Sequence, residues 1–158
     1  MLKLTKKADY GLIAMRHFAA QRGAASCSAK DVAEAYGIPQ EALAKILQRL
    51  ARARLLLSQH GTRGGYTLAR DARSISAFEV IQAIEGPVFM TSCHTSHGDC
   101  EQGTRCTVRE PLRKLSEKIE QALLRMKIAD LAADSTEVEF DSPTSTPREL
   151  VRLTSAGA

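Results

Sequence analysis

The sequence predicts a mainly α-helical protein with one small β-hairpin and one long helix in its second half. Three observations predict this fold class. Apolar residues recur at helical spacing in several separate segments of the chain. Two short apolar runs flank a glycine-rich stretch at residues 60–65, which is typical of a β-hairpin. Aromatic residues make up only 4% of the chain and tryptophan is absent, which disfavours a large β-sandwich.

The first two helices are predicted from their caps. Thr5 can cap a helix over residues 5–22, in which apolar residues repeat every three or four positions. Ser28 and Asp31 predict a capping box at the start of a short second helix. Gly37 supplies the left-handed residue that a tight turn to a third helix needs. A helix–turn–helix is therefore expected.

The third helix is expected to begin near Pro39, because proline is tolerated in the first helical turn. Its inward stripe is aliphatic: Leu43, Ile46, Leu47 and Leu50. Its other side is mostly basic or amide: Gln40, Glu41, Lys45, Gln48, Arg49 and Arg52. A helix with these two sides is suited to reading a groove of nucleic acid.

A two-stranded wing is expected after the third helix. Residues 55–57 and 66–68 are the predicted strands, and glycines between them permit a tight turn. Ser76 and Glu79 then predict a second capping box, which opens a short helix. These elements together predict a winged helix-turn-helix domain over residues 1–86.

A long dimerisation helix is expected over residues 107–132. Its apolar residues step by four and three, as in a coiled-coil seam: Val108, Leu112, Leu115, Ile119, Ala122, Met126 and Ala129. The first half of the chain offers little apolar surface to cover this seam. We therefore expect a homodimer, the alternative being a helix packed on its own domain. Residues 133–158 are rich in Ser, Thr, Pro and charge and are predicted to be a disordered tail.

Charge is divided unevenly between the two halves of the chain. Residues 1–70 contain 12 Lys or Arg against 4 Asp or Glu, whereas residues 71–158 contain 10 against 14. The basic half indicates a polyanionic partner. No signal peptide or membrane span is expected, so the sequence predicts a cytoplasmic protein without a membrane partner, whose thiols stay reduced.

Several segments, in order, resemble those of one bacterial family. They are Leu-Thr-Lys-Lys-Ala-Asp-Tyr-Gly at 4–11, Ser-Ala-Lys-Asp-Val-Ala-Glu at 28–34, Gly-Ile-Pro at 37–39, Leu-Ala-Lys-Ile-Leu-Gln-Arg-Leu at 43–50 and Gly-Gly-Tyr-Thr-Leu-Ala at 64–69. A loop with three cysteines then precedes a long helix. The set resembles the winged-helix regulators of iron–sulfur assembly, nitric oxide response and iron supply, the IscR, NsrR and RirA regulators. The resemblance covers roughly residues 1–130.

The resemblance implies a transcriptional repressor that binds double-stranded DNA as a homodimer, at a roughly palindromic operator. The long helices of the dimer would cross, and the third helix and wing would contact DNA. The residues expected at DNA are Lys30, Gln40, Lys45, Gln48, Arg49, Arg52, His60 and Arg63. Family members often carry an arginine before the first wing glycine. His60 stands there in this chain, so Arg63 is expected to take the minor-groove contact.

The predicted metal site lies in the loop over residues 87–106. Cys93, Cys100 and Cys106 follow the pattern C-x6-C-x5-C. Thiolates suit an iron–sulfur cluster or zinc, and these gaps are too wide for a zinc knuckle. The resemblance implies an iron–sulfur cluster, of the 2Fe–2S or the 4Fe–4S type, near the partner's first helix. The first gap is one residue longer than is common in the assembly and nitric oxide branches.

The fourth ligand is open. The assembly branch uses a histidine where this chain has Arg109. In the nitric oxide branch an acidic residue of the partner's first helix completes the cluster, and Asp9 stands at that position. His94 and His97 are alternatives within the loop. A weak or open fourth position would expose the cluster to nitric oxide or oxygen, or to loss when iron is scarce. Cys27 is expected to be a buried small residue, and His17 is expected to be packed or half-exposed and not a ligand.

Two other interpretations are kept. One is a regulator of the same fold that holds zinc or senses oxidants through its thiols. The other is a small electron-transfer or iron–sulfur assembly protein. The sequence contains neither a phosphate-binding glycine loop in the required strand–helix context nor a recognisable set of catalytic residues, so no enzyme is predicted.

Overall fold

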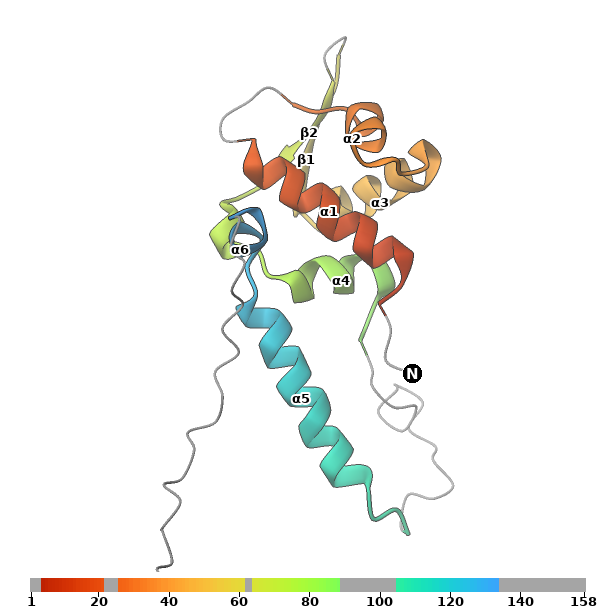
Figure 1. Cartoon of the computed structure of the whole chain (residues 1–158), viewed down its shortest axis with the longest axis vertical. Helices are drawn as coiled ribbons and strands as arrows, with labels where there is room; N and C mark the ends of the chain where they lie inside the picture. The colour runs from red at the N-terminus through yellow and green to blue at the C-terminus, as the bar shows by residue number, and fades with distance from the viewer. Residues whose placement is uncertain (1–3, 22–25, 62–63, 89–104, 134–158) are drawn as a thin grey trace, which may run out of the picture.

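The computed structural model describes residues 4–21, 26–61, 64–88 and 105–133. Its elements follow in the order α1 (Lys6–Ala20), α2 (Ala29–Tyr36), α3 (Gln40–Arg52), β1 (Leu56–Gln59), β2 (Gly65–Leu68), the 3-10 helix η1 (Ala72–Ser74), α4 (Ala77–Glu85), α5 (Arg109–Arg125) and α6 (Ile128–Ala132). Helices α1–α4, α6 and the hairpin form one body, from which α5 extends (Figure 1). The mainly helical, winged helix-turn-helix fold expected from the sequence is confirmed.

The predicted caps are present. The Thr5 side chain accepts a hydrogen bond from the backbone N–H of Ala8 at 3.3 Å. Both capping boxes form, at the N-termini of α2 and α4. Gly37 ends α2 with φ 63° and ψ 30°, the left-handed conformation that favours glycine. Local hydrogen bonding and backbone preference therefore set the helix starts and the tight turn.

One apolar core holds the body together. It combines residues from α1, α2, α3, α4 and β1 with Ile128 of α6, and Met15, Leu43, Leu47, Leu50, Ile75 and Val80 are fully buried. Gly11 of α1 packs directly against α4: a Cβ at this position would lie 2.1 Å from Cδ1 of Ile84. The bare backbone at Gly11 therefore allows the two helices to pack closely.

The wing is a two-stranded hairpin that one isolated β-bridge joins to the segment before α2. Strands β1 and β2 pair antiparallel, with Leu56 opposite Leu68. Cys27 pairs with Tyr66 on the other side of β2, through hydrogen bonds of 3.3 and 2.8 Å between their backbones. The predicted first strand at 55–57 is displaced, because β1 begins only at Leu56 and runs to Gln59. Segment 26–28 thus anchors the wing to the helix–turn–helix.

Replacing Gly65 by alanine is expected to lower the free energy of unfolding by about 1–3 kcal/mol, the usual cost of overpacking. The reason is that an added Cβ would lie 2.5 Å from the backbone oxygen of Cys27, and a backbone atom gives way less easily than a side-chain end. Urea unfolding measures the change. Ser58→Ala, on the exposed part of β1, is the control and should change stability by less than about 0.5 kcal/mol. Equal stability of the two variants would contradict this packing argument.

The prediction of one long helix over residues 107–132 was wrong in one respect, because this segment forms two helices, α5 and α6. Helix α5 ends at Arg125, and Met126 is extended with φ −66° and ψ 108°. The physical reason is pairing with a distant segment: Ala77 N–H donates to the Met126 carbonyl at 2.8 Å, and Ile128 N–H donates to the Ile75 carbonyl at 2.9 Å. Ile128, fully buried, therefore joins the core of the body.

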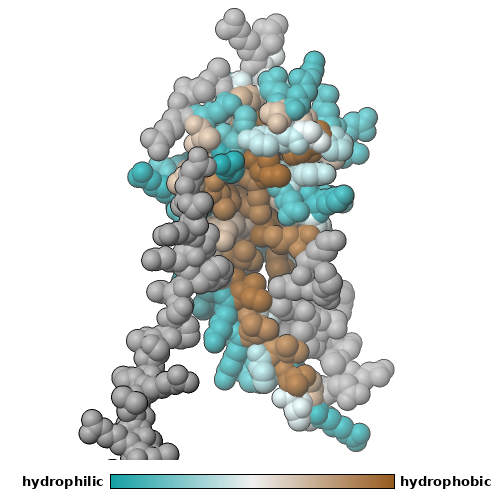
Figure 2. All heavy atoms as spheres, in the orientation of Figure 1, coloured by the Kyte–Doolittle hydropathy of each residue, from teal (hydrophilic) through white to brown (hydrophobic). Residues whose placement is uncertain are grey.

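Helix α5 presents an uncovered apolar face. None of its residues is buried. Leu115 is 46% exposed and Val108, just before the helix, is 55% exposed. Apolar side chains form a continuous stripe down this helix from the body (Figure 2). The predicted tail lies outside the described residues, apart from Ala133, which follows α6.

Candidate nucleic-acid interface and metal centre

Helix α3 separates an apolar side from a polar side. Its inward residues are at most 3% exposed, and they are the four that the sequence predicts. Gln40, Lys45, Gln48 and Arg52 are exposed on the helix, with Glu41 as the acidic residue of its first turn. Basic and amide side chains on an exposed helix can donate hydrogen bonds to phosphate oxygens and to base edges.

Arg49 takes a different position from the other basic residues of α3. Its Nη1 donates to the carbonyl oxygen of Ile84 at 2.5 Å. Carbonyls in the last turn of a helix have no partner within the helix. Arg49 therefore caps the end of α4 and holds α3 against it, so its guanidinium is directed to the protein itself.

Lys30 lies in the first turn of α2 and is exposed. Its Nζ is 3.8 Å from Oε1 of Glu34, and the two side chains are 64% and 69% exposed. Such a pair within one helix contributes only about 0.3–0.5 kcal/mol. Lys30 is therefore free to exchange this partner for a phosphate.

At the wing, the described residues include one of the two predicted contacts. His60 is exposed directly after β1, whereas Arg63 lies outside the described residues. A further exposed arginine, Arg54, was not predicted from the sequence. It is exposed between α3 and β1 and, among the described non-glycine residues, alone has a positive φ, 59°. The run Arg-Ala-Arg at 52–54 was the available signal.

The candidate metal centre is described in part. Cys106 is half-buried and lies shortly before the first residue of α5, while Asp9 is exposed in the first turn of α1. Cys93, Cys100, His94 and His97 lie outside the described residues, and the described part contains no group of three metal-ligating side chains. The donor chemistry of the loop, three thiols in one short segment, fits an iron–sulfur cluster.

Cys27 and His17 belong to a separate polar network. The Cys27 thiol donates to Oε1 of Gln21 at 2.7 Å, and Nε2 of Gln21 lies 2.8 Å from Nε2 of His17. Nδ1 of His17 is 3.2 Å from the hydroxyl of Tyr36. Burial lowers the pKa of His17, an effect that nearby Asp31 opposes but does not cancel. His17 is half-buried, which agrees with the expectation, whereas Cys27 is half-buried and not buried as predicted; its thiol lies in this polar network.

Within the described residues, no helix is both long and apolar enough to span a membrane.

Comparison with sequence families gives one match over most of the chain. The model of the Rrf2 family, described as an iron-dependent transcriptional regulator, matches residues 4–134. The transcriptional regulator IscR of Vibrio vulnificus strain YJ016 is 34% identical over 139 residues, which cover 88% of this chain and 82% of that protein. IscR of Xenorhabdus nematophila is 30% identical over 161 residues, covering 96% and 98%.

Solved structures agree with these relatives. The structure of CymR, the global cysteine regulator of B. subtilis, superposes with a TM-score of 0.67 at 28% identity and covers 85% of this chain and 99% of its own. The structure of T. potens IscR superposes with a TM-score of 0.68 at 27% identity and covers 90% and 94%. The likeness therefore includes the winged domain and most of the chain that follows it.

Proposed function

Because the chain belongs to the Rrf2 family of iron-dependent transcriptional regulators, we propose that it is a homodimeric repressor that senses an iron–sulfur cluster. Its relatives are named transcriptional regulators, so the chain is a DNA-binding regulator and not an enzyme. The homodimer, the cluster and repression are the parts that the proposal adds.

The observation that carries the proposed contact with DNA is the exposed side of α3. This helix is held by four buried aliphatic residues and presents Lys45, Gln48 and Arg52 outward. A recognition helix in the major groove needs such a side, and a wing beside it reaches the neighbouring minor groove. In the proposed complex Lys30 neutralises a phosphate and Arg63, assisted by His60, takes the wing contact. Two copies would read a roughly palindromic operator.

The proposed dimer is supported by the apolar face of α5. Leu115 and Val108 are about half exposed in a single chain, and Leu112 and Ile119 lie on the same side of the helix. An exposed apolar stripe of this kind marks an interaction surface. Its heptad spacing is that of two helices that pack along each other, so the proposed partner is a second copy.

The proposed cluster site uses Cys93, Cys100 and Cys106 of one chain. Asp9 of the partner subunit is the first candidate for a fourth ligand, and its exposure on α1 agrees with that role; His94 and His97 are the alternatives. When bound, the cluster would supply iron that can react with nitric oxide or oxygen, or be lost when iron is scarce. The protein itself would pass a movement of the thiol loop to α5, because Cys106 lies shortly before this helix. Closing or opening the thiol loop would therefore displace the N-terminal end of α5.

The first experiment is purification without oxygen, followed by the absorption spectrum and assays for iron and acid-labile sulfide. We expect a brown protein with iron and sulfide in matching amounts. Cys106→Ala should lose the colour, while Cys27→Ala should keep it, since Cys27 binds Gln21 outside the loop. A colourless protein after cluster reconstitution would overturn the cluster proposal and favour zinc or thiol chemistry on the same fold.

The second experiment measures binding to DNA from upstream of the protein's own gene, with and without the cluster. A gel shift that depends on the cluster supports the sensor, and transcription in vitro from that DNA tests repression. If the protein binds this DNA equally well with and without the cluster, the proposed DNA binding stands, but the proposal that the cluster is the signal fails.

A further inference from the structure

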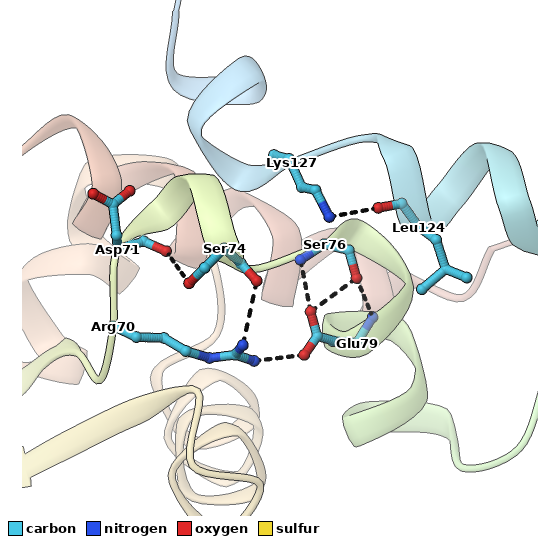
Figure 3. Close-up of polar contacts among 7 residues, drawn as sticks. All are labelled: Arg70, Asp71, Ser74, Ser76, Glu79, Leu124 and Lys127. Carbon is cyan, nitrogen blue, oxygen red and sulfur yellow. Dashed lines mark hydrogen bonds and ion pairs between the residues drawn. The ribbon is translucent and has the colours of Figure 1, made fainter.

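Arg70 links the end of the wing to helix α4. It lies two residues after β2, and its guanidinium points toward the start of α4 (Figure 3). Nη1 donates to the carbonyl oxygen of Ser74 at 3.2 Å, and Nη2 donates to Oε1 of Glu79 at 2.5 Å. The two side chains are 42% and 34% exposed, so water screens this ion pair only in part. The chain that leaves the wing is thus fixed to α4.

Glu79 uses its second carboxylate oxygen on a different segment. Oε2 accepts from the backbone N–H of Ser76 at 2.9 Å and from the Ser76 hydroxyl at 2.9 Å. Burial alone would raise the pKa of Glu79, but the hydrogen bonds from Ser76 and Arg70 outweigh it and hold the pKa below its usual value. The carboxylate is therefore ionised at neutral pH and joins Arg70 to Ser76.

Ser76 in turn adjoins the joint between α5 and α6. It is 1% exposed, the one polar residue that is buried in the described part of the chain. Its backbone lies opposite Lys127 in an antiparallel bridge, flanked by the two hydrogen bonds from Ala77 and Ile128 described above. Lys127 Nζ also donates to the Leu124 carbonyl at 2.8 Å, near the end of α5 (Figure 3).

We infer that Arg70 and Glu79 are positioning residues that set the wing and the α5–α6 joint together. A two-stranded hairpin is marginally stable alone, so its direction depends on what holds its base. Arg70 and Glu79 connect that base, through Ser76, to the backbone that ends α5. The link rests on the contacts themselves. Its use in regulation rests on the proposed function, because a movement of α5 affects DNA affinity only if the two chains form the proposed dimer.

The test uses the full chain, with Arg70→Met as the variant and Arg73→Met as the matched control. Arg73 lies on the neighbouring η1, is exposed, and loses the same charge. Arg70→Met leaves the Ser76–Glu79 capping box in place, so α4 should keep its start. Hydrogen exchange with mass spectrometry reports the wing strands and the joint separately.

Arg70→Met should raise exchange roughly fivefold both in β1–β2 and in the peptides that contain Ala77 and Ile128, while Arg73→Met should match the wild type. A rise confined to the wing, or no rise, would overturn the link. Arg70→Lys, which keeps a donor to Glu79, should restore part of the protection at both places.

DNA footprinting gives a second readout. Arg70→Met should lose minor-groove protection beside the operator and roughly tenfold in affinity, with major-groove protection retained. Unchanged minor-groove protection would show that Arg70 does not position the wing. If neither the wild type nor any variant binds DNA, the proposed function fails, and hydrogen exchange still decides whether the link exists.

Discussion

Leu115→Asp is expected to turn the proposed dimer into a monomer and to weaken operator binding by at least about 100-fold. Leu115 is 46% exposed on α5, so the substitution removes no core contact within one chain. In the proposed dimer it would place two carboxylates in an apolar seam, where burying an unpaired charge is costly. Two monomers would then bind half-sites independently and lose the gain of about 10²–10⁴ that linked binding gives.

Light scattering coupled to size exclusion measures the mass, and fluorescence anisotropy measures the affinity. Gln121→Asp, an exposed position of α5 away from the seam, is the control and should remain a dimer that binds DNA. If Leu115→Asp keeps the mass of a dimer, the apolar face of α5 is not the interface. If Leu115→Asp becomes a monomer with unchanged affinity, one winged helix-turn-helix domain is sufficient for operator binding.

Lys45→Glu is expected to lower operator affinity by roughly 100-fold in the dimer and to flatten its salt dependence. Lys45 is exposed on the outward side of α3, so reversing its charge should leave the buried stripe intact. Each phosphate contact contributes about 0.9 to the magnitude of the slope of log affinity against log salt concentration. Removal of one contact from each of the two DNA-binding domains should therefore lower that magnitude by nearly two.

The control for this substitution is Lys114→Glu, which makes the same charge change on an exposed residue of α5. Anisotropy titrations at four or five salt concentrations give both affinity and slope. Equal losses for the two variants would show that only net charge matters and that α3 is not the reading helix.

Local features of this fold were predictable because their causes lie within a few residues. Ser28 and Asp31 satisfy each other and the first turn of α2, and Gly37 supplies a left-handed residue where the chain must turn. The stripe from Leu43 to Leu50 is equally local, since its spacing matches the helical period and its burial follows.

Long-range features were not predictable from the same reasoning. The apolar steps of α5 continue past Met126, yet the helix stops there because residues 75–77 offer backbone hydrogen bonds some fifty positions away in sequence. Arg49 lies by spacing beside the outward face of α3, but its guanidinium donates to the carbonyl of Ile84 in the last turn of α4. In both cases the hydrogen-bond partner that determines the structure lies in a segment far away in sequence, so local spacing does not reveal it.

The proposed metal centre rests on the chemistry of its side chains and not on a geometry that the sequence could supply. Thiols favour a soft-metal site by donor type, whereas the segment that holds most of them has no apolar periodicity from which a structure could be inferred. Asp9 could be named as a fourth ligand only through family resemblance, because the proposed arrangement brings it from a second chain.

The pairing of residues 126–128 with 75–77 also makes α5 a lever. Its Arg125 end is clamped to the body, and its other end, next to Cys106, is the tip of an arm of 17 residues, about 26 Å long. A turn of about 10° at the clamp moves that tip by about 4.5 Å. In the proposed dimer, with the two α5 helices along each other, a shift of a few ångströms at the thiols would therefore rotate each body, and the separation of the two α3 helices would change with it.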